Sequence, residues 1–80
     1  MQSTGIASRA AVELAKAERL VVRTNFLIEL QRQFVEYLYQ TNNDVTSAKM
    51  EFDGLLAGLV SSVARRHRLR AIVRAQTNAA

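Results

Sequence analysis

Apolar residues recur every three to four positions along two long segments of the chain, and a short polar break separates the segments near the middle. This spacing is typical of amphipathic helices. The break is Thr41-Asn42-Asn43-Asp44 and contains no proline. Asn and Asp interrupt helices because their side chains bond to nearby backbone groups, and Asn tolerates left-handed conformations. The pattern predicts a helix over residues 7–40, a turn at 41–44 and a helix over 45–76, with frayed termini.

The predicted fold class is all-α, an antiparallel two-helix hairpin of coiled-coil type that forms a single domain over residues 1–80. A short turn between two long helices favours this packing. Folding at the break places Phe34 opposite Phe52 and Gln31 near Leu55. The residues expected to be buried between the helices are Leu20, Leu27, Leu30, Phe34 and Leu38 in the first helix, and Val45, Ala48, Phe52, Leu55, Leu56, Leu59 and Val63 in the second.

Capping residues stand near both predicted helix starts. Ser3, Thr4 and Ser8 are candidate N-caps of the first helix, since a short polar side chain can accept a bond from a free N–H of the first turn. Asp44 or Thr46 can do the same for the second helix.

A domain of 80 residues buries a thin core, only about 60% of the surface that the unfolded chain exposes. The chain has no cysteine, so neither disulfides nor a thiolate metal site can reinforce it. Association with another chain is the remaining way to stabilise so small a domain. We therefore expect dimerisation into a four-helix bundle, or docking on a protein partner.

Both predicted helices carry more apolar or small residues than one partner helix can cover. The apolar arc of the first helix is too wide for a single neighbour. The second helix has a face of small residues, including two glycines, each of which costs about 1 kcal/mol relative to alanine. Tolerated surface residues would also produce this pattern, but a close helix contact outside the hairpin explains both features. The predicted interface is Val21, Ile28, Val35, Tyr39, Gly54, Ala57, Gly58, Ser61 and Ala64.

Five arginines fall within ten residues near the C-terminus: Arg65, Arg66, Arg68, Arg70 and Arg74. The structural interpretation is that they lie at the open end of the hairpin and pair there with Glu13 and Glu18. The functional interpretation is a phosphate-binding patch for nucleic acid or an anionic membrane, because the guanidinium group donates two bonds at once. No aromatic residues interleave the run for base stacking. Ion pairing and solvation are the favoured interpretation.

The sequence offers little for catalysis. His67 is the only histidine and no cysteine is present, so a usual zinc site cannot form, and no serine in reach by sequence suggests a catalytic triad. A two-helix domain also leaves no room for a ligand pocket of ordinary size. We expect no enzymatic activity, no cofactor and no small-molecule substrate. The longest charge-free apolar run, residues 54–64, is too short to span a membrane, and the expected location is cytoplasmic.

A set of residues on both sides of the break forms a further pattern: Leu27, Ile28, Gln31, Phe34, Leu38, Asp44, Thr46, Ala48, Leu55, Leu56 and His67-Arg68-Leu69. These residues resemble those of short uncharacterised two-helix proteins common in alphaproteobacteria. The resemblance covers residues 24–70 and implies a helical hairpin, with no activity, cofactor or site. This chain differs in having Asn42-Asn43 where that group often has a glycine.

Three functions are compatible with these features. The first is a non-enzymatic protein–protein interaction module, either homodimeric or docked on a partner. The second is nucleic-acid binding through the C-terminal arginines. The third is a small inhibitor of a host protein, derived from a phage or mobile element.

Overall fold

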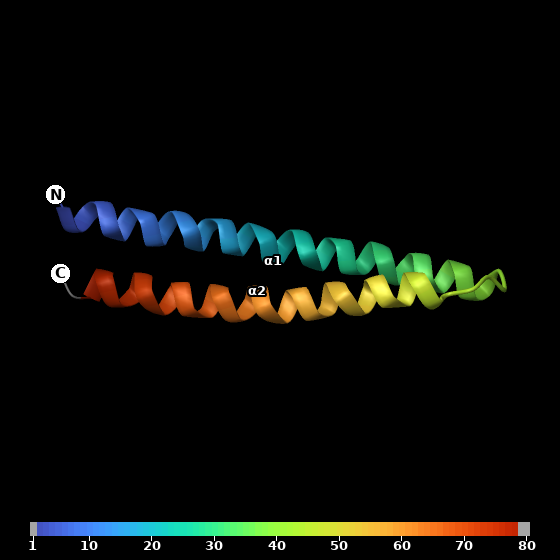
Figure 1. Cartoon of the computed structure of the whole chain (residues 1–80). Coiled ribbons are helices and arrows are strands. Elements are labelled where there is room, and N and C mark those ends of the chain that lie inside the picture. The colour runs from blue at the N-terminus through green and yellow to red at the C-terminus, as the bar shows by residue number, and fades with distance from the viewer. Residues whose placement is uncertain (1, 79–80) are drawn as a thin grey trace.

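The computed structural model describes the backbone of residues 2–78 and the side chains of residues 9–78. It contains two antiparallel helices, α1 (Gln2–Gln40) and α2 (Thr46–Asn78), which lie side by side with both termini at one end (Figure 1). The predicted all-α hairpin is confirmed. Helix α1 begins earlier than residue 7, and the N-cap candidates Ser3, Thr4 and Ser8 lie outside the described side chains.

The end of α1 is closed by a hydrogen-bonded turn that needs a left-handed residue. Asn42 has a φ of 60°, the conformation that asparagine tolerates better than most residues. The backbone N–H of Asn43 donates to the carbonyl of Leu38 over 2.8 Å, and that of Asn42 donates to Tyr39 over 3.2 Å. These two bonds satisfy carbonyl groups that the last helical turn leaves free. Asparagine thus takes the place of the usual glycine at this helix end.

The start of α2 is capped by Asp44, one of the two predicted candidates. Its Oδ1 accepts hydrogen bonds from the backbone N–H of Thr46 over 3.0 Å and from the Thr46 hydroxyl over 2.7 Å. Both bonds favour the ionised carboxylate, so they lower the pKa of Asp44. The turn at residues 41–45 therefore carries its own polar contacts, and Val45 at its end packs into the contact between the helices.

The helices meet along a seam whose members repeat at alternating steps of three and four residues, the heptad pattern of coiled coils. Its most buried members are small: Ala17, Val21, Thr24 and Ala48 each expose less than a tenth of their surface. No described side chain reaches complete burial. From residue 9 the seam is Ala10, Leu14, Ala17, Val21, Thr24, Ile28, Gln31, Val35 and Leu38 in α1, Val45 directly before α2, and Ala48, Phe52, Leu55, Leu59, Ser62, Arg66, Leu69, Val73 and Gln76 in α2.

The prediction of the buried face of α1 is wrong for every residue except Leu38, which is half-buried. Leu20, Leu30 and Phe34 each expose 48% of their surface and Leu27 exposes 38%. The seam instead uses the positions one residue later, about 100° around the helix. Ala17, Val21 and Thr24 on that face are smaller than the leucines, which suits a close approach of the two helix axes. In α2, only Leu56 and Val63 of the predicted stripe lie outside the seam.

The predicted register is also displaced by about one helical turn. The Gln31 amide Nε2 donates to the Ala48 carbonyl over 2.9 Å and to Glu51 Oε2 over 3.3 Å. Gln31 therefore contacts a part of α2 that is closer to the turn than its predicted neighbour Leu55. These bonds supply partners for a polar side chain in the seam, where an unpaired amide would be costly.

The molecule is a thin rod of 61 × 15 × 14 Å. Its radius of gyration is 18.0 Å, against about 12 Å for a compact domain of this length. A two-helix rod covers only one side of each helix. The remaining sides determine what the protein can bind.

Candidate functional site

An exposed apolar surface runs along one side of the seam on α1. Leu20, Leu27 and Phe34 each directly precede a seam residue, so all three project to the same side. Leu30 and Tyr37 lie beside them, three residues further along the helix. These five side chains expose between 38% and 60% of their surface. They form one continuous stripe on the closed half of the rod.

The small residues of α2 lie on the same side of the seam. Arg65 and Glu13 pair across that side, with Arg65 Nη2 3.0 Å from Glu13 Oε2. Leu20 lies seven residues after Glu13 and Gly58 seven residues before Arg65, so both occupy equivalent positions on this side. A Cβ added at Gly54 or Gly58 would meet no atom within 4 Å. Ser47, which is exposed, lies seven residues before Gly54 and so on the same side. The apolar flank is defined as Leu20, Leu27, Leu30, Phe34 and Tyr37 of α1 with Ser47, Gly54, Gly58 and Ser61 of α2.

The opposite side of the hairpin is charged. Arg70 Nη2 lies 2.9 Å from Glu18 Oε2, and Arg32 bridges Glu29 and Glu36 over 2.6 and 2.9 Å. The hydrogen bonds from Arg32 and then Gln33 lower the pKa of Glu29 to about 2, and its partners raise the pKa of Arg32. This side also exposes apolar residues, since Leu56 and Val63 stand at seven-residue intervals before Arg70 and expose 40% and 36% of their surface.

The structure separates the residues of the predicted interface. Val21 is buried in the seam and Ile28 and Val35 are half-buried there, so these three belong to the contact within the hairpin. Tyr39 is exposed at the closed end. The α2 members Gly54, Ala57, Gly58, Ser61 and Ala64 are all exposed. On the apolar flank, Gly54 and Gly58 are accompanied by α1 residues that the sequence analysis predicted to be buried between the helices: Leu20, Leu27, Leu30 and Phe34.

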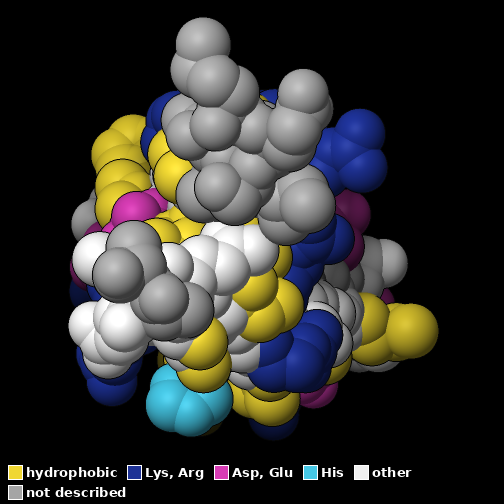
Figure 2. Space-filling view, turned by 90° about the vertical axis from the view of Figure 1, so that its left-hand side faces the viewer, with side chains coloured by type: hydrophobic (Ala, Val, Ile, Leu, Met, Phe, Trp, Pro, Cys, Tyr) yellow, Lys and Arg dark blue, Asp and Glu magenta, His cyan; other side chains and the backbone are white. Residues whose placement is uncertain are grey.

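Folding also gathers basic residues at the open end, which carries the termini. Residues 9–24 and 59–78 hold nine basic and two acidic side chains, a net charge of +7. Residues 25–58 hold two basic and five acidic ones, a net charge of −3. The end-on view shows Lys and Arg side chains on several sides of this tip (Figure 2). The basic end is defined as Arg9, Lys16, Arg19, Arg23, Arg65, Arg66, Arg68, Arg70 and Arg74.

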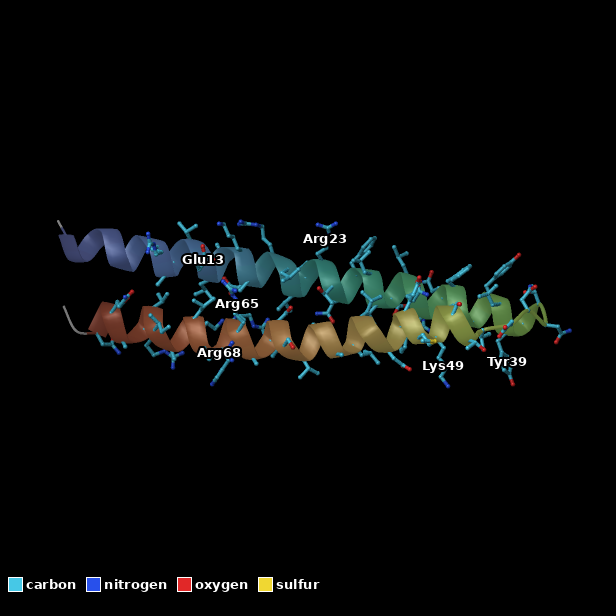
Figure 3. The ribbon with its side chains drawn as sticks, in the orientation of Figure 1. Glu13, Arg23, Tyr39, Lys49, Arg65 and Arg68 are labelled. Carbon is cyan, nitrogen blue, oxygen red and sulfur yellow. The ribbon has the colours of Figure 1, made fainter. Side chains whose placement is uncertain are left out.

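The C-terminal arginines have different surroundings. Arg65 and Arg70 pair with Glu13 and Glu18, which confirms that ion pairs join the two helices at the open end. Arg66 is half-buried in the seam. Figure 3 shows Arg65 turned towards Glu13, whereas Arg23 points away from α2 and Arg68 points away from α1. Arg9, Lys16, Arg19 and Arg23 of α1 were missed as members of this cluster, because only the antiparallel fold places them beside the C-terminal arginines.

Two depressions lie among the described residues, and both are open to solvent. The larger depression, about 870 Å³, is open and lined by α1 alone, from Lys16 to Phe26, and one helix cannot surround a ligand. A smaller one of about 180 Å³ lies between the helices at the open end, beside Glu13 and Arg65. Within residues 9–78, no three His, Asp or Glu side chains lie close enough to hold a metal ion. Neither helix, over its described length, is long and apolar enough to cross a membrane.

Comparison of the chain with protein-family models, with curated proteins and with solved structures gives no match. Function must therefore be argued from the two surfaces, the apolar flank and the basic end.

Proposed function

We propose that the protein is a non-enzymatic protein–protein interaction module that associates through its apolar flank. The observation that carries the proposal is the exposure of Leu20, Leu27, Leu30 and Phe34 along one side of the rod. Scattered exposed apolar residues are ordinary, but a contiguous stripe of large ones is typical of interaction surfaces. On the opposite side of the hairpin, charged pairs interrupt the exposed apolar side chains.

Surface area supports the same proposal. The chain exposes 6235 Å². A compact monomer of its mass, 8.9 kDa, would expose about 4,800 Å². The excess of about 1,400 Å² is larger than the roughly 800 Å² that each partner contributes to a standard protein interface. Association can thus bury what folding leaves exposed.

Sedimentation equilibrium on matched variants tests this proposal. The double variant Leu27→Lys/Phe34→Lys places two charges on the apolar flank, and we expect it to lose association by at least tenfold in Kd. The control Val22→Lys/Val60→Lys places the same charges at sites that expose 70% and 71% of their surface and lie off the flank. We expect the control to associate as the unmodified chain does.

Two outcomes would contradict the proposal. One is a thermally stable monomer that binds no apolar dye such as ANS. The other is equal weakening of association by the flank variant and by its control, because that result would reflect added charge and not the loss of a specific face.

A second candidate function is phosphate-backbone binding by the basic end, as in nucleic-acid binding. The observation that favours it is the joining of Arg9, Lys16, Arg19 and Arg23 to the C-terminal arginines, which leaves a net charge of +7 on one half of the rod. Such a cluster attracts polyanions through counterion release, whatever their sequence. The ion pairs of Arg65 and Arg70 with glutamate weigh against it, since paired arginines are partly neutralised.

Salt-dependent binding to duplex DNA and to RNA tests the second candidate. Each lost phosphate contact on B-DNA reduces the steepness of the log–log salt dependence by about 0.9. Arg68→Ala/Arg74→Ala should therefore flatten the slope by nearly 2, while Arg32→Ala/Lys49→Ala, which removes equal charge from the closed half, should not. Equal slopes for the two variants, or binding unaffected by Arg65→Ala/Arg66→Ala/Arg68→Ala, would refute it.

A further inference from the structure

We infer that the partner on the apolar flank is a second copy of this chain, packed head to tail, so that two hairpins form a four-helix bundle with its two-fold axis near Gly54. The inference rests on the proposed function, for which it names the occupant and its orientation. Three independent observations lead to it: the area left exposed, the position of the flank on each helix, and the distribution of charge.

The area suits a second copy. If each chain buries most of its excess of about 1,400 Å², the dimer buries roughly 2,000–2,800 Å² in total, within the range of obligate homodimers. Such interfaces are more apolar than transient ones. The flank meets this requirement, because its α1 half is made of leucine and aromatic side chains.

The two halves of the flank are centred at the same level of the rod. On α1 the apolar stripe extends from Leu20 to Tyr37, so its midpoint lies close to Ile28. On α2 the exposed small residues Ser47, Gly54 and Ser61 repeat at seven-residue intervals, which places their midpoint at Gly54. The bonds from Gln31 to Ala48 and Glu51 bring these midpoints to one cross-section of the antiparallel hairpin.

A shared midpoint is what a two-fold axis across the rod requires. Such an axis packs α1 against the second copy's α1 and α2 against its α2, each pair antiparallel, with equivalent residues at equal distances from the axis. Large side chains then fill the α1 contact. At the α2 contact, Gly54 and Gly58 allow the backbones a close approach. The open space around both glycines within the hairpin leaves room for that neighbour.

Charge selects head-to-tail packing over the alternative in which the two hairpins point the same way. A same-direction dimer would place the +7 half of each chain against its identical counterpart. Head-to-tail packing brings basic residues such as Lys16 and Arg23 beside the −3 half of the other copy. Opposed potentials favour an interface, and like-charge contacts disfavour it. The outermost basic residues would project from both tips of the bundle.

Distances between spin labels on single cysteines test the orientation in the full chain, which has no native cysteine. Gln40 and Ala71 are exposed and lie 12 residues from Ile28 and 17 from Gly54, respectively. Head-to-tail packing separates the two copies of each label by about 36 Å at residue 40 and about 51 Å at residue 71, at 1.5 Å per residue on each side of the axis. Gln40→Cys and Ala71→Cys chains are labelled separately and measured by double electron–electron resonance.

The outcomes separate the inference from the proposed function. Distances near these two values in a chain that sediments as a dimer support the inference. Distances of roughly 20–25 Å at both positions, the width of a four-helix bundle, would overturn head-to-tail packing while leaving association intact. A monomer that binds apolar dye would overturn the second copy as occupant, and a stable monomer without dye binding would overturn the proposed function as well.

Discussion

Replacing both glycines of the apolar flank by alanine should strengthen the hairpin and weaken its association. Gly54 and Gly58 stand inside α2, where alanine is favoured over glycine by about 0.8–1 kcal/mol per position. Neither new methyl group would meet an atom of the hairpin within 4 Å, so nothing offsets this gain in the single chain. We expect Gly54→Ala/Gly58→Ala to stabilise the monomer by nearly 2 kcal/mol, a rise in Tm of about 10 °C for a domain of this size.

The same methyl groups would stand between the two α2 helices of a dimer. A backbone contact that depends on glycine must open to admit them, and we expect Kd to rise at least tenfold. Circular dichroism melting at a concentration below Kd measures the first effect, and sedimentation equilibrium measures the second. Ser61→Ala is the matched control, because it improves helix propensity without adding volume.

Two results would refute the reasoning. A lower Tm for the dilute double variant would mean that the glycines serve a contact within the hairpin. An unchanged Kd together with a higher Tm would mean that the α2 helices do not approach closely, and the small residues would then be tolerated surface positions.

Three further predictions concern the seam, the turn and the carboxylates. Val21→Ala should destabilise the dilute hairpin by about 2 kcal/mol, because Val21 is buried, whereas Leu27→Ala should lower the stability of the dilute hairpin less and mainly raise Kd. A larger loss of stability for Leu27→Ala than for Val21→Ala in urea titrations would instead place Leu27 in the seam. Asn42→Val should lower stability by about 1–3 kcal/mol and Asn42→Gly should not, since a β-branched residue at φ 60° is strained; equal Tm values for the two variants would contradict this. Glu29 and Asp44 have lowered pKa values in the folded chain, so the stability they contribute is present above their unfolded pKa values near 4 and is lost as pH falls through their lowered folded-state pKa values, that of Glu29 being about 2. Tm measured from pH 7 to pH 2 should fall mainly below pH 4.5, and less steeply in Glu29→Gln.

The hairpin and its turn could be predicted because local chemistry determines them. Asn42 and Asp44 end one helix and start the next through bonds to residues within five positions, and no distant contact is involved. Much of the α2 seam was also predictable, since Phe52, Leu55 and Leu59 have few apolar competitors on neighbouring faces. The pairing of the open-end arginines with Glu13 and Glu18 followed from the antiparallel arrangement.

The buried face of α1 could not be chosen from periodicity, because two adjacent faces repeat with the same heptad spacing. Leu20, Leu27 and Phe34 form one, and Val21, Ile28 and Val35 form the other. Ranking by side-chain size favours the first, while close packing of two helices favours the face that also contains Ala17 and Thr24. The deciding quantity is the distance between the helix axes, which depends on both helices at once. The error in register has the same origin.

Folding and association are coupled in a rod this thin. Only four described residues are more than nine-tenths buried, and their side chains are those of alanine, valine and threonine. Five large apolar side chains remain exposed on the apolar flank, so a partner that covers them stabilises the folded state in proportion to the logarithm of its concentration. A substitution that weakens the flank contact will therefore reduce association and lower the Tm of a concentrated sample. A seam substitution lowers the Tm at every concentration. Melting curves across a dilution series thus separate residues that hold the hairpin from residues that bind its partner.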